Sequence, residues 1–181
     1  TLLTAILIAV GVVALLLFVA TAGSFKQVMV GGITDSMLGH LQIHHKGYTA
    51  SIDNLPLNLD LKPTAIRKVE TLLQSEPAIA SYSERVKLGA MFSNFNESTS
   101  IRLNGVDPVA EDKTVPALRQ RISEGDPKGL LVEPGQILIP DLLAKGMKVK
   151  TGDSVVLVAT NASGSVNGKT FIVRGVLEAV T

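Results

Sequence analysis

Three histidines, His40, His44 and His45, come nearest in type and spacing to a metal site. On an extended strand His40 and His44 share a face, where two imidazoles could bind a transition metal if a carboxylate joined them. Asp35 and Asp53 are the nearest acidic residues on either side. No ligand spacing typical of a metal site is matched, and the chain has no cysteine. We therefore expect hydrogen-bonded or solvated histidines and no metal.

Sequence motifs for catalysis and nucleotide binding are also missing. Serine, histidine and aspartate all occur, but not in the Gly-x-Ser-x-Gly pattern that exposes the nucleophile of α/β-hydrolases. Gly168-Lys169-Thr170 ends like a phosphate-binding loop, yet Gly164 lies one residue too close to complete the motif. The sequence therefore predicts a protein that is not an enzyme and holds no cofactor in this chain.

The composition excludes a further class of partner. Lysine and arginine total 17 and aspartate and glutamate 16 in 181 residues, and aromatic residues make up 4%. Such a chain has neither the basic surface nor the stacking side chains that nucleic-acid binding needs. The length suits one domain with its own core, and we expect no nucleic-acid partner.

The first 24 residues, 1–24, form a run without any charged side chain. As a helix this run would be roughly 36 Å long, enough to cross a hydrocarbon core of about 30 Å. Ala20-Thr21-Ala22 also matches a signal-peptidase site, and cleavage there would leave Gly23 as the first residue. The apolar part of a signal peptide is shorter, about 7–15 residues. We therefore predict a retained transmembrane helix in contact with membrane lipid.

A second apolar pattern follows in residues 25–41. Large apolar residues recur there at every fourth position, which places them on one face of a helix: Phe25, Met29, Ile33, Met37 and Leu41. This pattern predicts an amphipathic stalk that continues the membrane helix, and we call these five residues the stalk face. An ordinary first core helix of a globular domain is the alternative.

Residues 42–181 mix strand and helix patterns, which predicts an α+β domain. Helices are expected from Pro63 to the proline at position 77, over 115–124, and as a turn over 140–145. Strands are expected at 40–48, 78–92, 98–106, 136–139, 154–159 and 169–176, the last two joined as a hairpin. In strand 154–159, Val155 and Leu157 face one way and Val156 and Val158 the other, which predicts burial on both of its faces.

Three residues are predicted to serve backbone geometry. Gly152 and Asp153 form a turn into a strand, because glycine tolerates positive φ and aspartate can bond its own backbone. Gly175 interrupts a strand pattern, which indicates a bulge or a close backbone approach.

The order of several short motifs resembles a known family. SIRLNGVDP is followed by ALRQRISEGD, ILIPDLLAKGMKVKTGDSVVLV and GKTFIVRGVLE, and SMLGHLQI stands after the apolar run. This series is similar to the extracytoplasmic core domain of MacB-type, FtsX-like ABC transporter permeases, including the lipoprotein-releasing permeases LolC and LolE. Pro140 departs from the pattern, since the family usually has glycine there.

The resemblance implies a location and an assembly. The first helix would be retained in the cytoplasmic (inner) membrane, with the domain on the periplasmic side and three further transmembrane helices beyond this chain. Implied partners are a cytosolic ABC ATPase, which would hold ATP and magnesium, a second permease chain, identical or not, and a periplasmic carrier or adaptor protein. The domain would couple ATP hydrolysis mechanically to lipoprotein release or substrate export. The alternative is a single-pass membrane-anchored binding or sensor domain without an ATPase.

Overall fold

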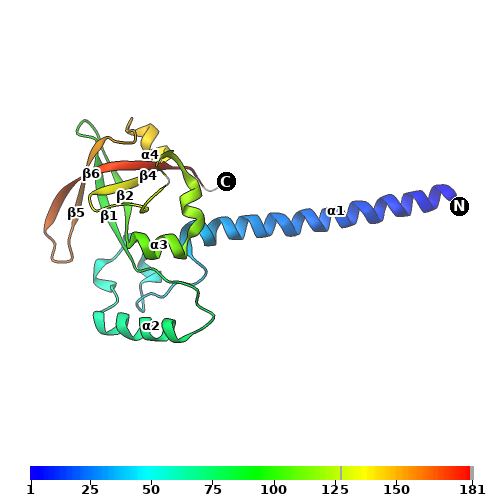
Figure 1. Cartoon of the computed structure of the whole chain (residues 1–181), viewed down its shortest axis with the longest axis horizontal. Coiled ribbons are helices and arrows are strands. Elements are labelled where there is room, and N and C mark those ends of the chain that lie inside the picture. Colours follow the sequence, from blue (N-terminus) through cyan, green and yellow to red (C-terminus); the bar gives the residue numbers. More distant parts are fainter. Residues whose placement is uncertain (127, 180–181) are drawn as a thin grey trace.

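The computed structural model describes residues 1–126 and 128–179, and it has two parts (Figure 1). The first is the long helix α1 (Leu2–Ile33), and the second is a mixed α/β domain built on a six-stranded sheet. The predicted α+β class is confirmed.

Helix α1 projects away from the domain along its whole apolar part (Figure 1). Among the described residues, one helical stretch, Leu2–Leu38, is long and apolar enough to cross a membrane, and its mean hydropathy reaches 3.1. None of that apolar window is buried against the rest of the protein. The helix thus exposes apolar side chains all around its axis, and exposure of such a surface to water is unfavourable.

The helix changes character where it meets the domain. Residues Thr34–Leu38 form the π-helical turn η1, and the chain leaves it at Gly39, whose N–H donates to the carbonyl of Thr34 at 2.8 Å. Leu41 lies beyond this turn. The prediction of one helix through residue 41 is therefore wrong in its last three residues, because the chain turns toward the domain there.

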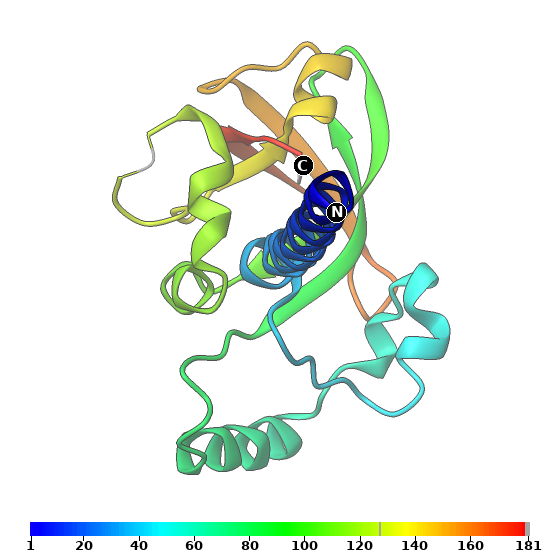
Figure 2. The ribbon, with the colours of Figure 1, turned by 90° about the vertical axis from the view of Figure 1, so that its right-hand side faces the viewer.

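The sheet has the strand order β2-β1-β5-β6-β3, and β4 pairs with β6. All pairs are antiparallel except β4 with β6. The strands are β1 (Arg85–Ser93), β2 (Ser98–Val106), β3 (Ile122–Gly125), β4 (Gln136–Pro140), β5 (Ser154–Thr160) and β6 (Val166–Leu177). The sheet curls strongly when seen along α1 (Figure 2).

The hydrophobic core lies inside this curl. Phe92 of β1, Val155 of β5 and Val173 of β6 are fully buried there. The short helix α4 (Asp141–Gly146) closes one end with Ala144, followed by Met147. Burying each large apolar side chain contributes roughly 1.5–3 kcal/mol, so this cluster stabilises the domain.

Several sequence predictions are confirmed. Helix α2 spans Pro63–Ser75 with proline in its first turn, as predicted from its apolar face. Strands β2 and β4 lie where they were expected, and β5 and β6 form the predicted hairpin with a shorter loop than expected.

Other predictions are wrong. Residues 40–48 form turns and irregular chain rather than a strand, and strand β1 begins only at Arg85 instead of residue 78. The helix expected at 115–124 is a 3-10 turn, η4 (Pro116–Arg121), which leads directly into β3. Helix α3 (Pro108–Thr114) was not expected, and on β5 only one face, with Val155 and Leu157, is fully buried. Short apolar runs do not separate helix from strand by period alone.

The part of the chain between the stalk and β1 is thinly packed. It contains the 3-10 turns η2 (Thr49–Asn54) and η3 (Leu57–Leu59) and helix α2, which lies apart from the sheet (Figure 2). Among the described residues between η1 and β1, Tyr48 is the one buried hydrophobic residue. Helix α2 has no fully buried side chain.

Two glycines occupy positions that restrict other residues. Gly152 has a φ of +92° in the turn before β5, where a side chain would be strained. A Cβ on Gly175 would lie 2.6 Å from the carbonyl oxygen of Glu124 on β3. The pairing of β4 with β6 shifts register beside Gly175. Strands β3 and β6 therefore approach too closely for any side chain at position 175.

We expect Gly175→Ala to lower the free energy of unfolding by about 1–3 kcal/mol, because one of the two backbones must move. Gly89→Ala is the matched control, since a Cβ on Gly89 in the same sheet meets nothing within 4 Å. Thermal unfolding of the full chain in detergent, followed by circular dichroism, measures both. Equal melting temperatures for the two variants would contradict the close approach.

Candidate functional site

The histidines do not converge. The Nε2 atom of His40 lies 3.7 Å from Oδ1 of Asp35, whereas the ring of His44 stacks on Tyr48 with centroids 4.9 Å apart. Nδ1 of His45 contacts the carbonyl of its neighbour Lys46 at 2.8 Å. Within the part of the chain that the structure describes, no three His, Cys, Asp or Glu side chains group as metal ligands.

The electrostatics of His44 also differ from those of a free histidine. Burial, and after it the nearby Lys87 ammonium, lower the pKa of His44. The imidazole is therefore neutral near pH 7, and its Nε2 contacts Oε1 of Gln42 at 2.9 Å. Asp53, the other candidate ligand, faces Arg102 at 3.6 Å instead.

The notable polar cluster of the domain lies where η1 meets it, and we call this cluster the junction. Its members come from η1, the segment that leads into β1, the first residue of β1, α3 and η4: Ser36, Ser83, Arg85, Glu111 and Arg121. Ser36 and Glu111 are each only 4% exposed. Buried polar groups are stable only when they are hydrogen-bonded. The hydrogen bonds of these residues therefore decide how η1 is attached to the domain.

Glu111 is the acceptor at the centre of the junction. Its Oε1 lies 2.7 Å from Nη2 of Arg85, and its Oε2 accepts from the Ser83 hydroxyl at 2.7 Å and from Nε of Arg85 at 3.1 Å. Helix α3 positions this carboxylate, because Asp107 caps its N-terminus by accepting from the N–H groups of Val109 and Ala110 at 2.8 Å. The result is a bidentate ion pair that is largely shielded from water.

Arg85 extends the cluster to the long helix. Its Nη1 donates to the carbonyl of Met37 in η1. The last carbonyls of a helix have no partner within the helix, and here a charged donor supplies one. Burial and then the Arg85 charge lower the pKa of Lys87, while Glu111 opposes the shift. The Arg85 guanidinium, whose charge Glu111 balances, therefore binds the end of the stalk to the domain.

Arg121 makes the second connection to the helix. Its Nη1 donates to the carbonyl of Ser36 at 3.4 Å, while Nε and Nη2 both donate to the carbonyl of Glu178 at 2.9 and 2.7 Å. The N–H of Glu178 in turn donates to the carbonyl of Arg121 at 2.8 Å. Burial lowers the pKa of Arg121. One side chain thus joins the segment that enters the domain to the segment that follows β6.

The side chains of the stalk face are exposed, unlike the buried groups of the junction. Its side chains remain open to solvent in the isolated chain, with exposed fractions between 43% and 70%: Phe25, Met29, Ile33, Met37 and Leu41. Four of these residues belong to α1 and η1, and Leu41 follows them. Met37 contributes its backbone carbonyl to the junction.

Sequence reasoning missed Arg85, Glu111 and Arg121. One signal was present, because Asp107-Pro108 followed by Glu111 is typical of a capped helix start. No sequence pattern links Arg85 or Arg121 to η1, since these contacts span 48 and 85 residues of chain.

Comparison with protein families identifies the class of this chain. The family model described as MacB-like periplasmic core domain matches residues 1–181. The chain therefore belongs to the family of MacB-like periplasmic core domains, which is typical of ABC transporter permeases. A search of curated proteins found no match.

The family and the fold agree on the location. A long apolar helix near the N-terminus precedes a periplasmic core domain. These two findings indicate a membrane-anchored extracytoplasmic domain, not itself catalytic. They favour a retained helix over a cleaved signal peptide.

We expect Arg85→Met to lower the free energy of unfolding by about 3 kcal/mol, since it leaves the Glu111 carboxylate buried without its cation. Arg102→Met is the control, because Arg102 forms a 3.6 Å pair with Asp53 in which both side chains are mostly exposed. That change should cost no more than about 1 kcal/mol. Urea unfolding of the full chain in detergent measures the difference, and equal losses would show that the junction pair has no special weight.

Proposed function

We propose that this chain is part of an ABC transporter permease in which the stalk carries the state of a cytosolic ATPase to the extracytoplasmic domain. The movement of that domain would then release a lipoprotein from the membrane or drive export of another substrate. The observation that carries the proposal is the junction, because a mechanical signal needs a defined connection between helix and domain.

The geometry of Arg121 supports this function. The chain enters the domain at Ser36 and reaches Glu178 after β6, and one guanidinium binds both backbones. A domain inserted between two membrane helices would require its two connections to lie side by side. A shift of the stalk would then reach both connections together.

The length of the stalk also fits. If residues 1–24 cross the bilayer, the helical chain from Phe25 to Leu38 extends roughly 20 Å beyond it. A continuous helix of this length transmits displacement better than a flexible linker, because its backbone hydrogen bonds resist bending. The π-turn η1 is the local irregularity between the helix and the domain, and such turns are frequent at functional sites.

The exposed stalk face calls for a packing partner. Burying each of its large side chains is worth roughly 1.5–3 kcal/mol. A helix that returns to the membrane after the domain, or the stalk of a second permease chain, would cover it. Coupling over distance requires an element with two arrangements that both ends bias, and a packed pair of stalks is such an element.

The energy source lies outside this chain in our proposal. A cytosolic ABC ATPase would bind ATP and magnesium, and a periplasmic carrier or adaptor would accept or guide the substrate. A single-pass anchored sensor is the competing function, and it needs no ATPase.

We expect Ile33→Asp to leave membrane insertion and the domain intact but to uncouple ATP hydrolysis from transport, because a carboxylate cannot be buried against an apolar partner. The measurement reconstitutes the full permease with its ATPase and follows substrate-stimulated hydrolysis and substrate release together. Coupling should fall at least about tenfold, the effect of losing roughly 1.4 kcal/mol.

Val28→Asp is the matched control. Val28 lies five positions before Ile33, roughly 140° around α1 at 3.6 residues per turn, and is 68% exposed, so the same charge there should leave coupling nearly unchanged. Normal coupling in Ile33→Asp would rule out the stalk face as the transmitter. Failure of any ATPase to co-purify with the wild-type protein would favour the sensor.

A further inference from the structure

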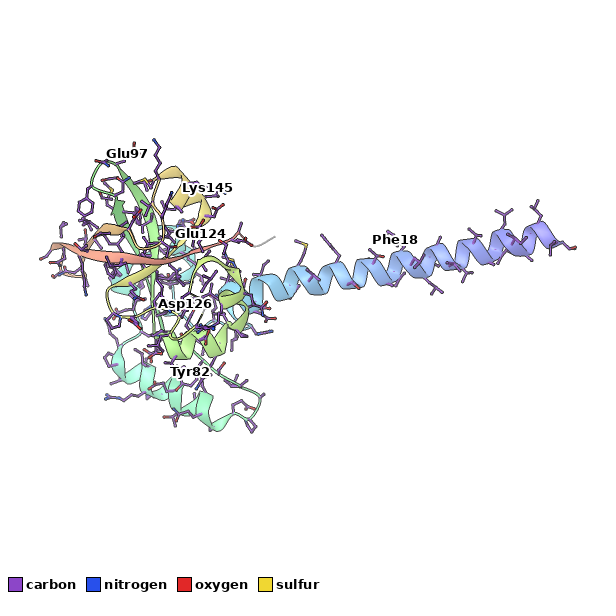
Figure 3. All side chains as sticks on the ribbon, turned by 45° about the horizontal axis from the view of Figure 1, so that its top comes forward. Phe18, Tyr82, Glu97, Glu124, Asp126 and Lys145 are labelled. Atoms are coloured by element: carbon purple, nitrogen blue, oxygen red, sulfur yellow. The ribbon has the colours of Figure 1, made fainter. Side chains whose placement is uncertain are left out.

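A cavity of about 470 Å³ opens between α2 and α3, on the side of the segment that leads into β1. Small-molecule sites are typically about 300–1,000 Å³, so the volume is sufficient for a ligand. Figure 3 labels Tyr82 between the two helices. The cavity plays no part in the junction or the stalk face.

The walls of the cavity are held by named contacts. The hydroxyl of Ser81 donates to the carbonyl of Lys113 at 3.1 Å, which attaches the segment to α3. Nε2 of Gln74 donates to the hydroxyl oxygen of Tyr82 at 3.1 Å, which attaches the same segment to α2. The segment that forms one wall of the cavity is therefore fixed to both helices, and the cavity itself is open to solvent.

Lys113 is the one cationic residue among those that line the cavity, and Asp107 is the one anionic residue. The Lys113 ammonium is exposed and, among residues 1–126 and 128–179, has neither an ion pair nor a hydrogen-bond acceptor. The hydroxyl proton of Tyr82 likewise has no acceptor in the described chain, since the oxygen accepts from Gln74. The Asp107 carboxylate, which also lines the cavity, already accepts two N–H groups as the cap of α3. Lys113 and Tyr82 thus each bring to the cavity a donor that no described residue engages.

The remaining lining is apolar. Leu73 comes from α2, Ile79 from the connecting segment and Val109 from α3. Val109 is 50% exposed although it is a large apolar residue. A ligand with a hydrocarbon body would remove this surface from water, which is favourable at roughly 25 cal/mol per Å².

We propose that this cavity binds a small amphipathic monoanion, a carboxylate carried on an apolar body of about six to eight carbons. A single ammonium and a single phenolic donor match the charge and the two oxygens of a carboxylate. A doubly charged phosphate would leave one negative charge without a partner. The proposal does not depend on the transport function.

Octanoate is the probe for this site. The full chain is placed in lipid nanodiscs at pH 7.5, and binding is followed by saturation-transfer NMR, with empty nanodiscs subtracted for partition into lipid. Octanoate should bind saturably, and octanamide, which has the same chain without the charge, should bind about fivefold more weakly, as for one exposed ion pair.

Lys113→Gln should weaken octanoate about fivefold and leave octanamide unchanged. Lys145→Gln on α4 is the matched control, because Lys145 does not line the cavity and pairs with Asp141 at 2.7 Å. This control variant should bind octanoate as the wild-type chain does. Tyr82→Phe removes the second donor with almost no change in shape, and it should also weaken octanoate. The proposal is overturned if octanoate binds no more than to empty nanodiscs, or if Lys113→Gln and Lys145→Gln bind it equally.

Discussion

The contact of Arg85 with Glu111 is the interaction on which the arrangement of this protein depends. The carboxylate is almost completely buried and balances a guanidinium that also holds the last turn of the long helix. A buried ion pair does not by itself guarantee stability, since desolvation offsets the attraction. Its value here is positional, because removing either partner leaves a charge without compensation where helix and domain meet.

Large apolar side chains are buried in the domain and exposed along the long helix. Within the curled sheet, residues such as Phe92 and Val173 are completely buried and fix the domain. Along α1 the same kinds of residue are exposed, which lipid and a packing partner would cover. The described chain therefore has a domain with its own buried core and a helix whose apolar surface is left exposed.

The sequence predicted much of this correctly where local chemistry decides. The charge-free run, the helix opened by Pro63 and the hairpin of β5 and β6 follow from length, turn residues and alternation. The predicted strand at 40–48 failed, because its alternation has no neighbouring strand to pair with and tertiary context overrides β-propensity. The helix expected near residue 115 failed because the chain pairs with β6 from Ile122 onward.

By itself the sequence determined the class of protein: an apolar helix long enough for a bilayer, an α+β domain, and no catalytic or nucleotide motif. Those properties depend on composition and short-range spacing, which each segment carries independently. The tertiary structure alone decided the junction, since Arg121 reaches Ser36 across 85 residues and Glu178 across 57. Hydrogen bonds of this kind depend on how the sheet curls and where α3 packs, and no local pattern encodes that geometry.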